Sequence, residues 1–126
     1  MLVPSNGESI MHNRARMRIS NRFAIDDLLE KGFDDIWLKP HTARNDHVYT
    51  QKGTYMATDL WNLFDGICFG NSTPYFMQIK TNAWAKRELF EKFQRNHDVN
   101  VLNINVTNKL KACNNKWRVF VNELHP

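Results

Sequence analysis

The clearest pattern of apolar and polar positions is a pair of short apolar runs in the middle of the chain. Residues 63–69 and 75–80 are apolar apart from a few polar side chains, and Gly70 to Pro74 lies between them. Apolar runs of this length, separated by glycine, asparagine and proline, are typical of two strands joined by a turn. We therefore expect a β-hairpin at the centre of the fold.

Periodic segments flank this hairpin on both sides. Helical spacing of apolar residues predicts a helix that Ser20-Asn21 caps and that runs to Lys31, and a second over residues 83–96 with Asn82 as its N-cap. Further strands are predicted at residues 33–39, 99–107 and 117–121, and a polar loop at 41–53. The order helix, three strands, helix, two strands predicts an α/β domain with a mixed β-sheet flanked by helices.

The first 19 residues carry a different pattern, which predicts a basic N-terminal arm or helix ahead of a single domain over residues 20–126. Apolar residues recur every four positions from Met11 to Phe23, and arginines run parallel to them. Clustered guanidinium groups on one face suit a polyanion, although a solvated helix face explains them equally well. The candidate nucleic-acid contacts are Arg14, Arg16, Arg18, Arg22 and Lys86.

Composition narrows the class of protein without identifying it. A chain of 126 residues with 42% hydrophobic residues is long enough for one folded core. Because no apolar run approaches the roughly 20 residues of a membrane span, and no secretion signal is recognisable at the start, we expect a cytoplasmic protein. The isolated Cys68 and Cys113 are expected to be reduced thiols. The net charge of +4 permits nucleic-acid binding but does not establish it.

Three polar side chains interrupt the predicted hairpin: Asp65, Gln78 and Lys80. Burying such groups without partners costs free energy, so their presence in apolar strands indicates a function. Gln78 and Lys80 share one face of their strand, because side chains alternate between faces. A five-residue loop that pairs Phe69 with Tyr75 would place Asp65 opposite Ile79, on the other face. We therefore predict a one-residue offset or a bulge that brings Asp65 to the face of Gln78.

An aspartate at the start of one strand, followed by Gln78-Ile79-Lys80 in the next, resembles the motif of the PD-(D/E)XK nuclease superfamily. This superfamily includes many restriction enzymes and archaeal Holliday-junction resolvases, and glutamine stands here where an acid is usual. The resemblance covers residues 20–121 in the order of elements. It implies a restriction-endonuclease-like fold and a metal-dependent endonuclease that hydrolyses phosphodiester bonds in DNA, including structured or branched DNA, as a monomer or a homodimer.

The resemblance also implies roles for individual residues. Asp65, Gln78 and the Ile79 carbonyl would hold Mg²⁺ or Mn²⁺, and Lys80 would position the attacking water or stabilise charge on the phosphate. The first helix of the family often adds an acid, for which Asp26, Asp27 and Glu30 are candidates, although their spacing favours solvated surface acids. Asp59 is either a further ligand or, more simply, a turn cap. The alternative function is a non-catalytic nucleic-acid-binding module on a nuclease-like fold.

Overall fold

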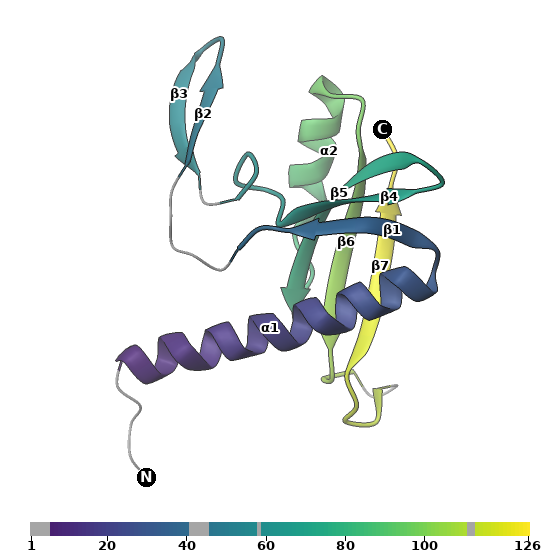
Figure 1. The fold of residues 1–126 in the computed structure, drawn as a ribbon. Coiled ribbons are helices and arrows are strands. Elements are labelled where there is room, and N and C mark those ends of the chain that lie inside the picture. Colours follow the sequence, from purple (N-terminus) through teal and green to yellow (C-terminus); the bar gives the residue numbers. More distant parts are fainter. Residues whose placement is uncertain (1–5, 41–45, 58, 111–112) are drawn as a thin grey trace.

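A mixed five-stranded sheet with two helices forms the body of the molecule, as a computed structural model shows (Figure 1). Residues 6–40, 46–57, 59–110 and 113–126 are described, with the side chains of the first helix from Arg18 onward. The strands lie in the order β1 (Phe33–Leu38), β4 (Gly66–Gly70), β5 (Thr73–Thr81), β6 (Asn100–Thr107) and β7 (Arg118–Leu124). This arrangement confirms the predicted α/β class and mixed sheet.

One connection makes the sheet mixed. β5 and β6 are parallel, and α2 (Arg87–Asn96) joins them, whereas the other neighbouring strands are antiparallel. Parallel neighbours need a crossover connection, which is usually a helix, and α2 supplies it. Within the described residues, no helix combines the length and apolar character that a membrane span requires.

α1 (Asn6–Glu30) is one continuous helix, so the separate helix that we predicted after a Ser20-Asn21 cap was wrong. Ser20 lies inside the helix and is 1% exposed, and its hydroxyl shares a hydrogen bond with the Thr81 hydroxyl on β5. The Ser20 side chain is therefore engaged by Thr81 and does not cap a helix. The boundary predicted between residues 19 and 20 falls inside α1, and the division into arm and domain stays a prediction.

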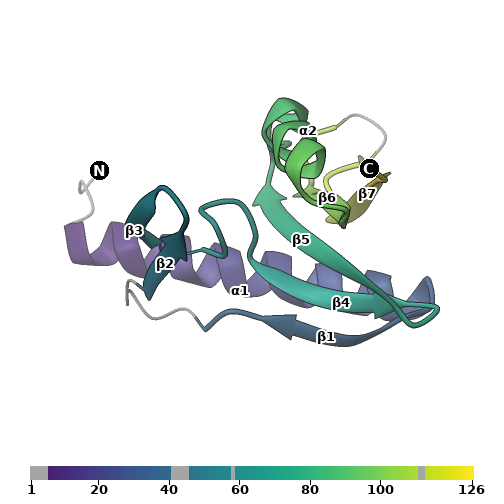
Figure 2. The ribbon, with the colours of Figure 1, turned by 90° about the horizontal axis from the view of Figure 1, so that it is seen from above.

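The predicted loop at residues 41–53 was also wrong for its second half. Residues 46–50 form β2 (Asp46–Thr50), which pairs with β3 (Gly53–Ala57) in a separate two-stranded sheet, while residues 41–45 lie outside the described part of the chain. The hairpin of β2 and β3 lies apart from the main sheet (Figures 1 and 2). We predicted a loop because most side chains in this segment are polar, although its β-branched and aromatic residues favour a strand.

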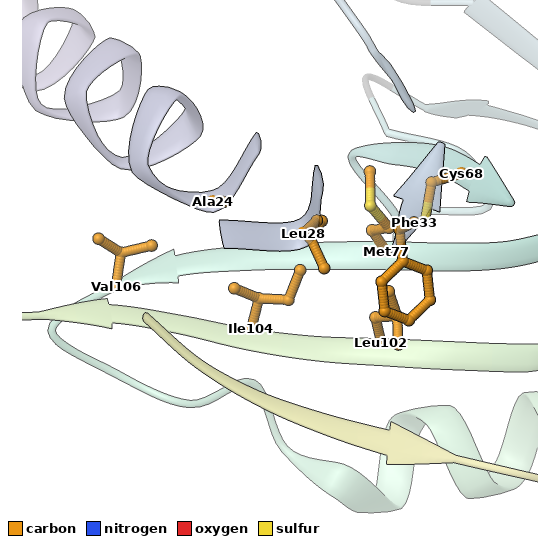
Figure 3. Packing of buried hydrophobic residues seen from close by; sticks show 8 residues of the cluster. All are labelled: Ala24, Leu28, Phe33, Cys68, Met77, Leu102, Ile104 and Val106. Carbon is orange, nitrogen blue, oxygen red and sulfur yellow. The ribbon is translucent and has the colours of Figure 1, made fainter. Parts of the chain in front are cut away.

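The two helices cover opposite faces of the sheet and bury two separate apolar clusters. On the α1 face, Ala24 and Leu28 pack against alternate strand residues that include Met77 and Ile104 (Figure 3). On the other face, Phe90 of α2 packs with Phe64, Val101 and Leu124. Cys68 and Cys113 are buried free thiols, and burial raises the pKa of Cys68 to about 11.

α2 begins later than predicted, because Asn82 is not its N-cap. The helix starts at Arg87, and Lys86 occupies the cap position. Asn82 has a positive φ of 56°, and its side-chain oxygen accepts hydrogen bonds from the Thr107 hydroxyl (2.8 Å) and the Asn108 N–H (3.2 Å). The asparagine therefore fixes the loop between β5 and α2 to the end of β6.

Candidate functional site

A tight turn sets the register of the β4–β5 hairpin up to the residue next to Asp65. The turn contains only Asn71 and Ser72, both with positive φ (49° and 65°), as in the tight turns that match strand twist. Phe69 consequently pairs with Pro74, and the ladder continues to the pair of Gly66 and Met77. Asp65 lies just beyond this last pair, and its N–H donates to the carbonyl oxygen of Met77 at 2.7 Å. The ladder therefore has the predicted one-residue offset, which the short turn causes, whereas the placement of Asp65 on the face of Gln78 stays a prediction.

Close contact between β1 and β4 fixes the strand end that carries Asp65. A Cβ atom added to Gly66 would lie 2.1 Å from the carbonyl oxygen of Trp37, so only glycine allows this approach. Beyond it, the Lys39 N–H donates to the carbonyl oxygen of Asp65 at 2.9 Å. The backbone of Asp65 is therefore held from the β1 side.

The Asp65 carboxylate lies at the fork where β4 and β5 separate. Its N–H donates to the Met77 carbonyl oxygen (2.7 Å), and its Oδ2 accepts the Ile79 N–H (2.9 Å). Because the N–H and C=O of one strand residue point to the same side, the Ile79 carbonyl faces this fork as well. The structure thus brings together the Asp65 carboxylate and the Ile79 backbone.

Burial raises the pKa of Asp65 above its ordinary value of 3.8. The hydrogen bond from Ile79 and the positive charges of Lys39 and Lys80 lower this pKa, whereas the negative charge of Asp59 raises it further. Burial outweighs the lowering contributions. A buried carboxyl among two cations and a second carboxylate has the perturbed ionisation that is common at functional sites.

Asp59 joins the cluster through an ion pair with Lys39. The turn that follows Asp59 is closed by the backbone, since the Asn62 N–H donates to the Asp59 carbonyl oxygen at 3.2 Å. The side chain is thereby available to pair with Lys39 and to act on the charge of Asp65. This arrangement favours a place for Asp59 in the site over the simpler role of a turn cap.

Two hollows lie beside the cluster, and they divide the predicted residues. The larger, of about 500 Å³, is lined by Gln78, Lys80 and Asp59 together with the loop before α2. The smaller, of about 30 Å³, is lined by Asp65, Ile79, Lys39 and other residues, among them Asn21 of α1. A hollow of this smaller size suffices for a single water molecule.

The predicted acids of the first helix lie outside both hollows. Asp26 is within 4.0 Å of Arg22, and Asp27 forms an ion pair with Lys31 at 2.6 Å. Glu30 is exposed near the end of α1. At the small hollow, α1 instead contributes Ser20 and Asn21. Asp26 and Glu30 are exposed, as their spacing indicated, whereas Asp27 is partly buried in its ion pair with Lys31.

The predicted nucleic-acid contacts are only partly described. Arg18 and Arg22 are exposed on α1, whereas the side chains of Arg14 and Arg16 lie outside the described part of the structure. Lys86 is exposed and lines the larger hollow. Among the members whose side chains are described, Lys86 is therefore the one that lies beside Gln78 and Lys80.

The donor groups present are compatible with a magnesium-type cation. Asp65 and Asp59 supply two carboxylates, and Mg²⁺ is commonly held by one or two. The side-chain oxygen Oε1 of Gln78 is buried and has no hydrogen-bond partner among the described residues, so an acceptor is available. No group of three or more histidine, cysteine, aspartate or glutamate side chains that could hold a metal ion occurs in the described ranges. The set would hold a cation by few protein ligands.

Sequence reasoning missed two contributors to this region. Lys39 pairs with Asp59 across 20 residues of chain, and no local pattern signals such a pair. Asn103 is 4% exposed on β6, level with Gln78, and its Oδ1 lacks a hydrogen-bond partner in the described structure. The one available signal was the alternation of asparagines with apolar residues along this strand. Comparison with family models, curated proteins and solved structures found no match to this chain.

Proposed function

We propose that this protein is a metal-dependent endonuclease of the PD-(D/E)XK type that hydrolyses phosphodiester bonds in DNA. The observation that carries the proposal is the position of Asp65 at the fork of β4 and β5. Its carboxylate accepts the Ile79 N–H at 2.9 Å and lies close enough to Lys80 for their charges to interact. The resemblance predicted this grouping for a catalytic site at the fork of two strands.

The architecture supports the same proposal. α1 precedes the antiparallel strands β1, β4 and β5, and α2 connects β5 to the parallel strand β6. This is the order of elements that a restriction-endonuclease-like fold implies. The finer fold assignment therefore forms part of the proposal, whereas the α/β class and the mixed sheet are observed directly.

In this proposal each residue of the site has a separate role in phosphodiester hydrolysis. Asp65, the Ile79 carbonyl and Gln78 would hold Mg²⁺, which when bound supplies charge neutralisation at the phosphate and an activated water. The Lys80 ammonium stabilises negative charge that develops on the phosphate oxygens. The Gln78 amide orients water through its oxygen. Lys39 keeps Asp59 beside Asp65, so that a second carboxylate adds negative charge to the site.

Gln78, at the position where an acid is usual, is expected to weaken metal binding. A neutral ligand attracts a divalent cation less strongly than a carboxylate, so we expect weak metal affinity that Asp59 partly restores. A single site in a chain of this size cuts one strand, so cleavage of both strands of DNA would need a homodimer. The absence of a third acid among the described residues favours the second candidate, a non-catalytic nucleic-acid-binding module.

The deciding experiment is cleavage of labelled linear, single-stranded, flapped and four-way-junction DNA with Mg²⁺, Mn²⁺ or EDTA. We expect metal-dependent cutting that falls by about 100-fold or more in Asp65→Ala and in Lys80→Ala, since each removes charge from the reacting centre. Lys92→Ala is the matched control, because Lys92 is an exposed lysine on α2. Binding without cutting, unchanged in both site variants, would instead establish the non-catalytic module.

A further inference from the structure

The wall of the larger hollow is a loop that β6 holds in place. The Ala83 N–H donates to Asn105 Oδ1 (3.0 Å), and Asn103 Nδ2 donates to the Ala85 carbonyl oxygen (3.2 Å). Asn82 is fixed to Thr107 by a third contact. Asn103 and Asn105 are only 4% and 5% exposed. Because these hydrogen bonds fix the loop before any ligand arrives, the hollow is preorganised.

The side chains that line this hollow combine an aromatic surface with cations. Trp84 is 42% exposed on the fixed loop, and Leu89 of α2 extends the apolar surface. Lys80 and Lys86 line the same hollow, and Gln78 adds an unpartnered acceptor oxygen. An aromatic face beside positive charges is the pattern by which proteins bind single-stranded nucleic acid, with bases stacked and phosphates neutralised.

The other tryptophan near this region is unsuited to that role. Trp61 packs edge-on against Phe76 and at a tilt against Phe93, with ring centroids 5.3 Å apart in both cases. The Trp61 ring is thus held against aromatic residues of the cluster beneath α2, and Trp61 does not line the hollow. Trp84 therefore provides the stacking surface that lies within the hollow.

We propose that the hollow binds one unpaired nucleobase of a DNA substrate, stacked on Trp84, beside the phosphate that the Asp65–Lys80 cluster cuts. This inference rests on the proposed function for the identity of the ligand. Lys86, which is exposed at the hollow, neutralises a neighbouring phosphate. Its volume of about 500 Å³ falls within the range of roughly 300–1,000 Å³ that is usual for ligand sites.

The proposal selects a class of substrate. A base inside a duplex is stacked and paired, and extracting it costs free energy that a single-stranded base does not require. The preferred substrate is consequently DNA with an unpaired base at the cut, as in a single strand, a flap or a branch. Fully paired linear DNA is the poorer ligand.

Binding measured in EDTA tests this inference without cleavage. We would compare fluorescence anisotropy of a labelled short single strand and of the corresponding blunt duplex. Trp84→Ala is expected to weaken binding of the single strand by about 5-fold or more, the lower end of one lost stacking contact, and to leave duplex binding nearly unchanged. Trp84→Phe should retain most of the affinity. Phe69→Ala is the matched control, because Phe69 is a 39% exposed aromatic residue outside the hollow.

Single-strand binding that is unaffected by Trp84→Ala, or weakened equally for both DNAs, would overturn the inference. Its failure is distinguishable from failure of the proposed function. If the protein cuts no DNA but loses single-strand binding in Trp84→Ala, the base site is supported and the nuclease is refuted. If cleavage depends on Asp65 but binding is unchanged in Trp84→Ala, the nuclease is supported and the base site is refuted.

Discussion

The two faces of β5 differ sharply, although one run of nine residues builds both. Met77 and Ile79 point to the α1 face, where the neighbouring strands add apolar side chains over the whole width of the core. Gln78 and Lys80 point to the other face. There an apolar cluster around Phe64 occupies only one end, and polar side chains occupy the other.

The apolar clusters on the two faces are explained by folding alone, whereas the polar side chains indicate a function. An apolar cluster on each face suffices to hold the helices against the sheet. Nothing in that packing calls for a partly buried amide at Gln78 or a partly buried carboxyl at Asp65, since burying either group costs free energy. Lys80 is exposed beside them. The polar end of the second face is therefore the part of the molecule whose composition the fold does not explain.

The largest expected effect on stability lies on the apolar face. Leu28 is fully buried beneath α1, so Leu28→Ala should lower the free energy of unfolding by about 2–5 kcal/mol through lost burial and a cavity. Its neighbour Leu29 is 50% exposed, and Leu29→Ala should change stability by no more than about 0.5 kcal/mol. Urea unfolding followed by circular dichroism measures both. Equal losses would show that the α1 face is not the principal core.

A smaller effect on stability should distinguish Gln94 of α2 from Gln78 of β5. Gln94 donates to the carbonyl oxygens of Val99 (3.0 Å) and Leu124 (2.8 Å), so Gln94→Met should cost about 1–3 kcal/mol by leaving both without their donor. The oxygen of Gln78 has no partner to lose within the described structure, so Gln78→Met should be neutral or slightly stabilising. Cleavage should nevertheless fall in Gln78→Met alone. A large loss of stability there would mean that Gln78 has a structural role.

The local features of the fold were predictable from sequence. The strands around Ile36, Ile67, Ile79 and Ile104 appeared where apolar runs and turn residues indicated them, and the hairpin has the one-residue offset that we predicted. These inferences depend on periodicity within a single element. The candidate cluster could be proposed because all its predicted members lie in one hairpin.

Features that depend on contacts between distant segments were missed. Ser20 and Asn82 have side chains typical of helix caps, but both are engaged with other elements, at Thr81 and Thr107 respectively. The pair of Lys39 with Asp59 likewise depends on how β1 passes the site. Capping propensity is a local preference, and tertiary hydrogen bonds override it.

The smallest effect is a dependence of stability on pH. Because burial raises the pKa of Asp65 above 3.8, the folded state holds this proton more tightly than the unfolded state. Asp65 therefore lowers stability as the pH rises from near 3.8 through the raised value, and its contribution is constant above that. Asp65→Asn should remove this decline. The difference in Tm between variant and wild type, in EDTA, should grow over that range and then level off; a difference that is constant with pH would contradict the buried carboxyl.

The central claim, that the fork of β4 and β5 is a divalent-cation site, is tested most directly by Mn²⁺ binding. Electron paramagnetic resonance of free Mn²⁺ would be compared for wild type, Asp65→Asn and Gln78→Glu. We predict weak binding by the wild type, about 10-fold or more tighter binding by Gln78→Glu because a carboxylate replaces a neutral ligand, and little binding by Asp65→Asn. Equal affinity in all three proteins would contradict the claim.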